Sequence, residues 1–397
     1  MFLERLELID FRSYAAAALR LSPGVSVLIG PNAQGKTNLL EAVHYLAIGS
    51  SHRVAADTPL VRVGADAAVV RAVARTDRSG APDGPQGRAL TVELELRPGG
   101  RNRVRLNGQP QPRVRDAIGQ IRSIMFAPED LGLVRGDPAD RRRFLDELLA
   151  QRRPAYLAAR QEYERVLRQR NALLRQHRGG GRGGGQALLE QTLPTWTESL
   201  VSVGATLLAA RIAVVHALAG PADAAYRDLV AASPQREAQG HLRLGYELST
   251  GRRVEATAGC GVPEPAALAT ELREGLAVVA QAELERGVTL AGPHRDELAL
   301  VLNGLPAKGY ASHGETWSLA LALRLASIDV LHDVGEEPVV LLDDVFAELD
   351  ELRRRRLAER CEGFEQVLVT AAVDAAVPLA GPRYLVHEGT VEPAVGR

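Results

Sequence analysis

The chain has little of several residue types on which common functions depend. Its 397 residues include two cysteines, Cys260 and Cys361, which have neither metal-ligand spacing nor the numbers for a disulfide framework, and this suits a reducing cytosol. Aromatic residues make up 4% of the chain, which argues against recognition of nucleic acid by base stacking. The formal net charge is −1, so any contact with DNA must come from a local basic patch.

The sequence shows no targeting segment. Charged residues occur within its first ten positions, unlike a signal peptide. The most apolar stretch, 205–219, contains Arg211 and His216 and is too short to span a bilayer. With 46% hydrophobic residues, we expect a cytoplasmic globular protein of two or three cores without membrane contact.

Lysine is also scarce, because the chain contains two lysines and 46 arginines. One lysine belongs to a segment with the spacing G-x-x-x-x-G-K-T, which consists of Gly30, Pro31, Asn32, Ala33, Gln34, Gly35, Lys36 and Thr37. In such a phosphate-binding loop, backbone N–H groups surround the nucleotide phosphates, the lysine contacts the β and γ groups, and the threonine binds Mg²⁺. An apolar run at 25–29 enters the segment and a helical pattern at 38–46 leaves it, which favours ATP and Mg²⁺ at a helix N-terminus over an ordinary turn.

Two adjacent carboxylates, Asp343 and Asp344, follow a second apolar strand. A buried parallel strand delivers such side chains to the sheet edge where metal–phosphate sites form. We expect Asp343 to hold Mg²⁺, mostly through water, and Asp344 to orient or deprotonate the attacking water, with Lys36 as the third catalytic residue. The alternative is an acidic turn, which the phosphate-binding loop disfavours.

A serine-capped helix is predicted between these two motifs. Ser312 is the N-cap, Gly314 follows, and Glu315 completes a capping box. The N-terminus of such a helix also attracts anions, and the functional interpretation directs it at a γ-phosphate held by another subunit. This motif alone is weak evidence. It becomes stronger because four motifs follow one another along the chain: the phosphate-binding loop, the serine-capped helix, the double-acid strand and the segment AELD at 347–350.

The element pattern predicts an α/β fold with an inserted helical domain. Residues 1–125 form the first part of a head, with strands at 2–10, 25–29, 67–76, 90–97 and 101–106 and a loop at 79–88. Residues 126–287 form a helical lobe, with helices at 138–149, 154–177, 187–218, 222–231 and 265–286 and a strand at 242–248. Its glycine-rich connection at 178–185 suggests a short projecting arm. Residues 288–397 complete the head, with strands at 288–291, 297–302, 339–342, 367–370 and 384–387 and helices at 314–333 and 351–362.

The order of these motifs resembles that of ABC-type ATPases, whose head is a mixed sheet with flanking helices. The long insertion resembles the SMC-like branch, and within it the chain is most similar to the RecF family. The segments that carry the resemblance cover nearly the whole chain: 11–14 (FRSY), 30–41 (GPNAQGKTNLLE), 51–53 (SHR), 126–131 (FAPEDL), 142–146 (RRFLD), 291–296 (AGPHRD), 310–314 (YASHG) and 342–350 (LDDVFAELD).

The resemblance implies an ATP-dependent DNA-binding protein of recombinational repair and replication-fork maintenance. Such proteins dimerise on ATP, hydrolyse it slowly as a switch, and assist RecR and RecO in loading RecA at single-strand gaps. It also implies that Arg12 lies against the nucleotide phosphates, that Ser312, Gly314 and Glu315 serve the nucleotide of a partner subunit, and that Asp350 crosses the dimer interface. DNA would be held by its backbone at single-stranded/double-stranded junctions.

Three positions depart from the family pattern. Thr316 and Trp317 follow Glu315 where the family usually has glutamine and arginine. The strand near 369–370 carries no switch histidine, and no glutamine-loop residue is identified after the strand at 125–127. The departure at Thr316 and Trp317 bears on the geometry and rate of hydrolysis more than on binding.

Several basic groups have two interpretations. Arg141–Arg143 and Arg353–Arg356 are either solvated helix faces or DNA contacts. The cluster of His294, Arg295 and Asp296 is either a solvated turn or part of the ATP or dimer interface. Lys308, the other lysine, precedes the serine-capped helix.

Two functions from different classes are compatible with the motifs. The first is a nucleotide-gated DNA clamp. The second is a turnover P-loop ATPase of a nuclease-associated or phage-defence system. The sequence has no further metal-binding or nucleophile cluster, which favours the clamp.

Overall fold

The computed structural model describes residues 1–76, 88–178, 184–230, 241–257, 261–335 and 337–394. Cys260 and all but the last residue of the loop predicted at 79–88 lie outside them. Two compact units are present: unit 1 is Met1–Leu131, Ala224–Gln239 and Trp317–Arg397, and unit 2 is Gly132–Asp223 and Gly240–Thr316. Two of the points at which the chain passes between the units lie within helices, one in α5 (Gly184–Val230) and one in α9 (His313–His332). The three-part division by residues 125 and 287 rests on sequence pattern and stays a prediction.

Unit 1 contains the sheet that carries the two catalytic motifs. Its strand order is β16-β15-β3-β14-β13-β8, with β16 antiparallel and the other five parallel. The bounds are β3 Gly24–Ile29, β8 Ser123–Phe126, β13 Val339–Asp343, β14 Gln366–Ala371, β15 Arg383–His387 and β16 Thr390–Pro393. The strands β3 and β13 are separated by β14 alone, so their carboxyl ends lie at one edge of the sheet.

A second, antiparallel sheet of unit 1 has the order β2-β1-β4-β5-β6-β7. The bounds are β1 Phe2–Phe11, β2 Tyr14–Arg20, β4 Ala68–Thr76, β5 Arg88–Leu96, β6 Arg103–Leu106 and β7 Gln109–Gln111. Helix α1 (Lys36–Ile48) shares one buried core with both sheets: Leu40 of α1, Leu6 of β1 and Leu341 of β13 belong to the same cluster. Besides α1, this unit contains α9 from Trp317 onward, the end of α5 from Ala224, α10 Val345–Glu348 and α11 Glu351–Cys361. Its 3-10 turns are Thr58–Leu60, Val114–Asp116, Pro128–Leu131 and Asp374–Ala376.

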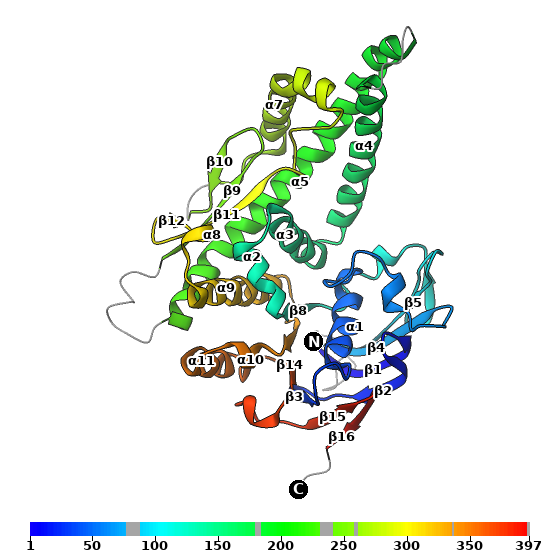
Figure 1. The fold of residues 1–397 in the computed structure, drawn as a ribbon, viewed down its shortest axis with the longest axis vertical. Coiled ribbons are helices and arrows are strands. Elements are labelled where there is room, and N and C mark those ends of the chain that lie inside the picture. The colour runs from blue at the N-terminus through cyan, green and yellow to red at the C-terminus, as the bar shows by residue number, and fades with distance from the viewer. Residues whose placement is uncertain (77–87, 179–183, 231–240, 258–260, 336, 395–397) are drawn as a thin grey trace. The chain divides into compact units, whose positions relative to one another are not determined.

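Unit 2 is mainly helical and includes a four-stranded sheet of order β10-β9-β11-β12. Its elements are α2 Gly132–Arg135, α3 Pro138–Arg152, α4 Ala155–Arg178, most of α5, β9 Leu242–Glu247, β10 Arg253–Glu255, α7 Pro265–Arg286, β11 Glu297–Leu302, β12 Leu305–Pro306 and α8 Ala307–Tyr310 (Figure 1). Buried Arg170 of α4 pairs at 2.6 Å with buried Glu283 of α7. Up to this point α4 is therefore part of the unit's packed interior, rather than the free arm expected from its charge.

Two predicted elements are wrong in ways that have a physical cause. Residues 288–291 form no strand, because side chains take the backbone donors: Asn171 accepts from Thr289 N at 2.8 Å and Glu283 from Leu290 N at 2.7 Å. The two helices expected at 187–218 and 222–231 are one helix, α5, which continues through Pro221. A proline removes one helical hydrogen bond, and the turns around it are held by the buried residues Leu218 and Ala222.

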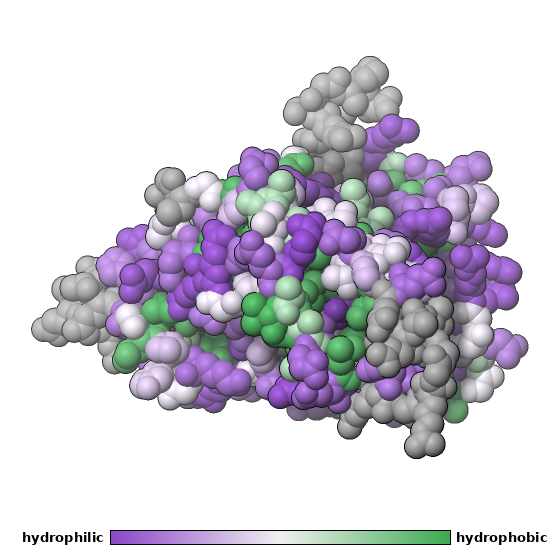
Figure 2. Space-filling view, turned by 90° about the horizontal axis from the view of Figure 1, so that it is seen from above, coloured by the Kyte–Doolittle hydropathy of each residue, from purple (hydrophilic) through white to green (hydrophobic). Residues whose placement is uncertain are grey.

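Helix α5 also corrects the membrane argument. From Gln191 to Val230 it is long and apolar enough to cross a membrane by length and composition alone, so the apolar stretch was wrongly expected to be too short. However, 56% of its most apolar window is buried inside the protein. Arg211 in its middle is buried and pairs at 2.8 Å with Asp146 of α3. The face seen in Figure 2 is mostly hydrophilic, with scattered hydrophobic areas. We conclude that α5, up to Asp223, is a core helix of unit 2.

Candidate functional site

The loop of residues 30–37 joins β3 to α1 in unit 1. Two of its glycines lie where no other residue fits. A Cβ on Gly30 would lie 2.1 Å from the backbone oxygen of Val386. Gly35 has a φ of +108°, and a Cβ there would lie 2.8 Å from Ser13 Oγ and 2.9 Å from Tyr14 Oη. The glycine spacing of the motif therefore follows from close packing as well as from phosphate chemistry.

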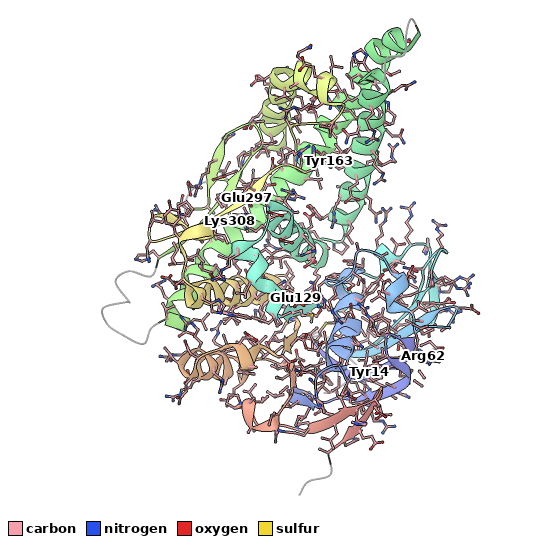
Figure 3. The ribbon with its side chains drawn as sticks, viewed as in Figure 1. Tyr14, Arg62, Glu129, Tyr163, Glu297 and Lys308 are labelled. Atoms are coloured by element: carbon pink, nitrogen blue, oxygen red, sulfur yellow. The ribbon has the colours of Figure 1, made fainter. Side chains whose placement is uncertain are left out.

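Lys36 lies over the loop in which it occurs. Its side chain is buried, and Nζ donates to the carbonyl oxygens of Gly30 at 2.8 Å and Pro31 at 3.1 Å. Tyr14, labelled in Figure 3, donates its hydroxyl to the carbonyl of Gly35 at 3.1 Å. The ammonium is thus fixed at the rim of the loop, in reach of an anion held by the loop's N–H groups.

The first carboxylate of the double-acid motif contacts the loop directly. Thr37 Oγ1 donates to Asp343 Oδ1 at 2.9 Å, and Thr370 Oγ1 of β14 donates to the same oxygen at 2.7 Å. Thr370 in turn accepts from the backbone N–H of Asp344 at 2.9 Å, and Asp344 has the left-handed φ of 51°. The strand β13 therefore ends at Asp343, and the chain turns at Asp344, which is the N-cap of α10.

Burial raises the pKa of Asp343, the hydroxyls of Thr370 and Thr37 lower it, and the charges of Asp344 and Glu129 raise it further. The pKa of Asp343 is therefore raised overall. A bound cation would act in the opposite direction, because its positive charge favours the ionised carboxylate. The described residues contain no group of three or more His, Cys, Asp or Glu able to hold a metal alone. One hydroxyl and one carboxylate in contact fit a cation that takes its other ligands from phosphate and water, as Mg²⁺ does.

Two residues of this region were missed by sequence reasoning. Thr370 was noted only for the absence of a histidine beside it. Glu129 (Figure 3) follows β8, the neighbour of β13, and its charge acts on Asp343. Glu129 thus lies just after the strand where a glutamine-loop residue was sought. It belongs to the segment FAPEDL at 126–131, which could have pointed to it.

Arg12 lies beside α1 and is bound by a carboxylate. Its guanidinium donates to both oxygens of Glu41, at 2.8 and 2.6 Å. Ser51 Oγ donates to the same carboxylate at 2.5 Å, and Arg53 lies 3.6 Å from it. Burial raises the pKa of Glu41, but the hydrogen bonds from Arg12 and Ser51 leave it below its ordinary value. In this structure Arg12 is therefore held by Glu41 beside the loop.

The serine-capped helix begins as predicted, in unit 2. Ser312 N donates to the Glu315 carboxylate at 2.8 Å, and Glu315 N donates to Ser312 Oγ at 3.3 Å, which is a capping box. Ser312 is exposed and Gly314 half-buried. The two departures that follow are turned inward: Thr316 is buried and donates to Ser312 O at 2.8 Å, and Trp317 is buried.

Asp350 is the N-cap of α11 in unit 1. Its carboxylate accepts from the backbone of Arg353 at 2.9 Å and pairs with the Arg353 guanidinium. Arg353 also donates to Ser318 of α9 at 2.7 Å. The run 353–356 is satisfied within the chain, since Arg354 donates to carbonyls while Arg355 and Arg356 pair with glutamates. Lys308 of unit 2 donates to Gly136 O at 2.8 Å.

The fold and the loop–carboxylate geometry together define the class: an ABC-type ATPase head of the SMC-like kind. The family model described as RecF/RecN/SMC N terminal domain matches residues 2–385. The chain is 51% identical over 394 residues to the DNA replication and repair protein RecF of Streptomyces avermitilis, covering 99% of this chain and all of that protein. It is 49% identical to RecF of Kineococcus radiotolerans, covering 96% and 95%.

The chain belongs to the RecF family of DNA replication and repair proteins. A solved structure described as the recombination mediator protein RecF-ATP of the RecFOR pathway aligns with a TM-score of 0.86 and 26% identity, covering 99% of this chain and 98% of that one. An Smc head domain with an extended coiled coil, 18% identical with a TM-score of 0.52, shares the fold. This membership favours DNA replication and repair over a nuclease-associated or phage-defence ATPase.

Proposed function

We propose that this chain is an ATP-gated DNA-binding switch. The observation that carries the proposal is the contact between Thr37 and Asp343, which joins the phosphate-binding loop to the double-acid strand at one sheet edge. Lys36 and the N–H groups of residues 30–37 would bind the phosphates, and Thr37 with Asp343 would hold Mg²⁺. The guanidinium of Arg12 would release the carboxylate of Glu41 and bind a phosphate of the nucleotide instead.

The hydrolytic step is proposed to be slow. Asp344 would orient or deprotonate the attacking water, and bound Mg²⁺ would supply charge neutralisation for the phosphate oxygens. Ser312, Gly314 and Glu315 of a second copy would complete the γ-phosphate site, and Asp350 would lie at the interface between copies. In this account ATP binding stabilises a homodimer and hydrolysis releases it.

The biological setting follows from the family. We propose a cytoplasmic protein that binds gapped DNA through its backbone and acts with RecR and RecO in loading RecA. The structural neighbour's description as a recombination mediator of the RecFOR pathway supports this setting.

The two lysines offer a matched test of nucleotide gating. In Lys36→Met the buried ammonium is lost, and we expect the binding of ATP, measured by titration calorimetry, to fall at least about 100-fold, with loss of ATP-dependent DNA binding. Lys308→Met removes the exposed lysine and should bind ATP like the wild type. Equal ATP affinity in Lys36→Met and the wild type would refute the proposal.

A further inference from the structure

A group of basic side chains in unit 2 takes no part in the nucleotide chemistry. It consists of Arg142 on α3 and of His294 and Arg295 on the loop that leads into β11. Arg142 is half-buried, and its Nη1 donates to the backbone oxygen of Asp296 at 2.7 Å. Arg295 is exposed, and its Nη2 donates to the backbone oxygen of Thr289 at 3.3 Å. Both guanidinium groups therefore donate to backbone oxygens of one short segment, 289–296.

The neighbours of Arg142 on α3 are already neutralised. Arg141 pairs with Glu297 through two hydrogen bonds of 2.6 and 2.7 Å. Arg143 pairs with Asp140 at 3.0 Å. Arg142, between them, binds a carbonyl oxygen. In the part of the chain that the structure describes, it forms no ion pair.

The carboxylate closest in sequence to Arg295 is turned inward. Asp296 is buried and accepts from Ser249 N at 2.7 Å and from Tyr246 Oη at 3.1 Å. Burial raises the pKa of Asp296 to about 6, against the opposing hydrogen bonds and the charge of Arg211. Arg295, like Arg142, pairs with no carboxylate among the described residues.

His294 fixes the loop that carries Arg295. One ring nitrogen, Nδ1, lies 2.7 Å from the hydroxyl of Tyr163 on α4 (Figure 3), and Nε2 lies 3.2 Å from the carbonyl of Thr289. Gly292 has a φ of +134°, and a Cβ there would lie 2.5 Å from that hydroxyl. Burial, together with the charges of Arg295, Arg142 and Arg211 and against the hydrogen bond with Thr289, lowers the pKa of His294 to about 4. The charges of both arginines thus act at His294, while Glu297 and Asp296 act on Arg142 without forming an ion pair with it among the described residues.

We propose that Arg142 and Arg295 bind a phosphate of the DNA backbone, with His294 as the residue that positions their loop. The planar fork of a guanidinium matches the oxygens of a phosphate, and half-buried Arg142 is held in place by its carbonyl contact. Few aromatic residues are present for stacking, so phosphate contacts dominate the expected affinity. This site rests on the proposed DNA binding and names residues that carry it.

The test is the salt dependence of binding to a fluorescein-labelled gapped duplex, measured by anisotropy on the full chain with ATP and Mg²⁺. Each phosphate contact contributes about 0.9 to the slope of log affinity against log salt concentration. The double variant Arg142→Gln, Arg295→Gln removes one phosphate contact, so it should lose about one unit of slope and at least about tenfold in affinity at ~0.1 M salt. Arg143→Gln is the matched control on the same helix and should change affinity by less than about twofold.

The variants Arg142→Lys and Arg295→Lys keep the charge and should retain most of the slope, which separates phosphate binding from a fold defect. A double glutamine variant with the slope of the wild type overturns the site alone. A wild-type chain that does not bind the gapped duplex overturns the proposed function itself.

Inorganic phosphate distinguishes DNA from a small anion. In a protein with labelled histidines, the gapped duplex should raise the pKa of His294, observed by NMR, because it brings negative charge to the arginines. If inorganic phosphate produces the shift and the duplex does not, the assignment to DNA is overturned.

Discussion

Side chains at the candidate nucleotide site hydrogen-bond to one another or to the loop itself. Lys36 binds two carbonyls, Thr37 binds Asp343, and Arg12 binds Glu41. Each is a polar group whose contact is satisfied inside the protein, and each contact must be exchanged when a phosphate or a cation arrives. At the residue scale, these contacts hold the side chains of the site in place, and only Arg12 would give up an ion pair when it exchanges its partner for a phosphate.

The titration of His294 gives a prediction at this scale. Its pKa is about 4 in the folded chain against an ordinary 6.5, so the folded state resists the proton that the unfolded chain accepts. The resulting stability is fully present above about pH 6.5 and is lost as the pH falls toward 4, by about 3 kcal/mol at most. Urea unfolding at several pH values should show this loss in the wild type and not in His294→Gln.

Asp296 has the opposite effect on the pH dependence of the free energy of unfolding. Its pKa is raised to about 6, so the folded state takes up a proton more readily than the unfolded chain and is stabilised as the pH falls through 6. The comparison is therefore made between the wild type and His294→Gln, in which this contribution is common. A difference in unfolding free energy that stays constant from pH 7 to pH 4 would contradict the assignment.

The local motifs of the site could be predicted from the sequence, and its cross-strand partners could not. Glycine spacing, the lysine and the double acid are consecutive residues, so their pattern is visible in the chain. Thr370 reaches Asp343 because β14 lies between β3 and β13, and the charge of Glu129 acts on Asp343 because β8 lies on the other side of β13. Strand order is a tertiary property that no local pattern reveals.

At the scale of elements, the loop between β3 and α1 depends on where glycine is placed. Gly35→Ala should combine a positive-φ penalty with a clash against Ser13 and Tyr14, and abolish measurable binding of ATP. Gly24→Ala is the control, since Gly24 has a φ of +88° and open space around its Cβ. It should cost about 1 kcal/mol and leave the binding of ATP unchanged. Calorimetric titration measures the ATP affinity of both variants, and thermal unfolding measures their stability. Wild-type ATP affinity in Gly35→Ala would contradict the proposed role of the loop.

Two errors in the prediction of strands have the same cause: hydrogen bonding to a partner, and not local strand propensity, decides whether a strand forms. The β2 segment reads YAAAALR, and alanine has low strand propensity, but β2 pairs along β1 and is held by that ladder. The reverse error occurred at 288–291, where β-branched and apolar residues suggested a strand and side-chain acceptors took its donors. Strongly periodic or well-capped elements, such as α7 and β11, have the predicted bounds.

At the scale of the whole molecule, the two units carry different parts of one proposed reaction. Unit 1 holds the phosphate-binding loop, Asp343 and Asp344, whereas Ser312 and Gly314 belong to unit 2. In the account given above, these two sets meet across two copies of the chain with ATP between them. DNA binding and dimerisation are then coupled, because each is stabilised by the same nucleotide.

The mass of Asp344→Asn in solution tests this coupling most directly. The variant keeps the loop, Lys36 and Asp343 for binding and loses the carboxylate proposed to activate water, so ATP should bind and persist. Light scattering with saturating ATP and Mg²⁺ should give about twice the 42.6 kDa of a single chain, and one chain's mass with ADP. Lys36→Met should remain at one chain's mass throughout. A single-chain mass for Asp344→Asn with saturating ATP would contradict the account.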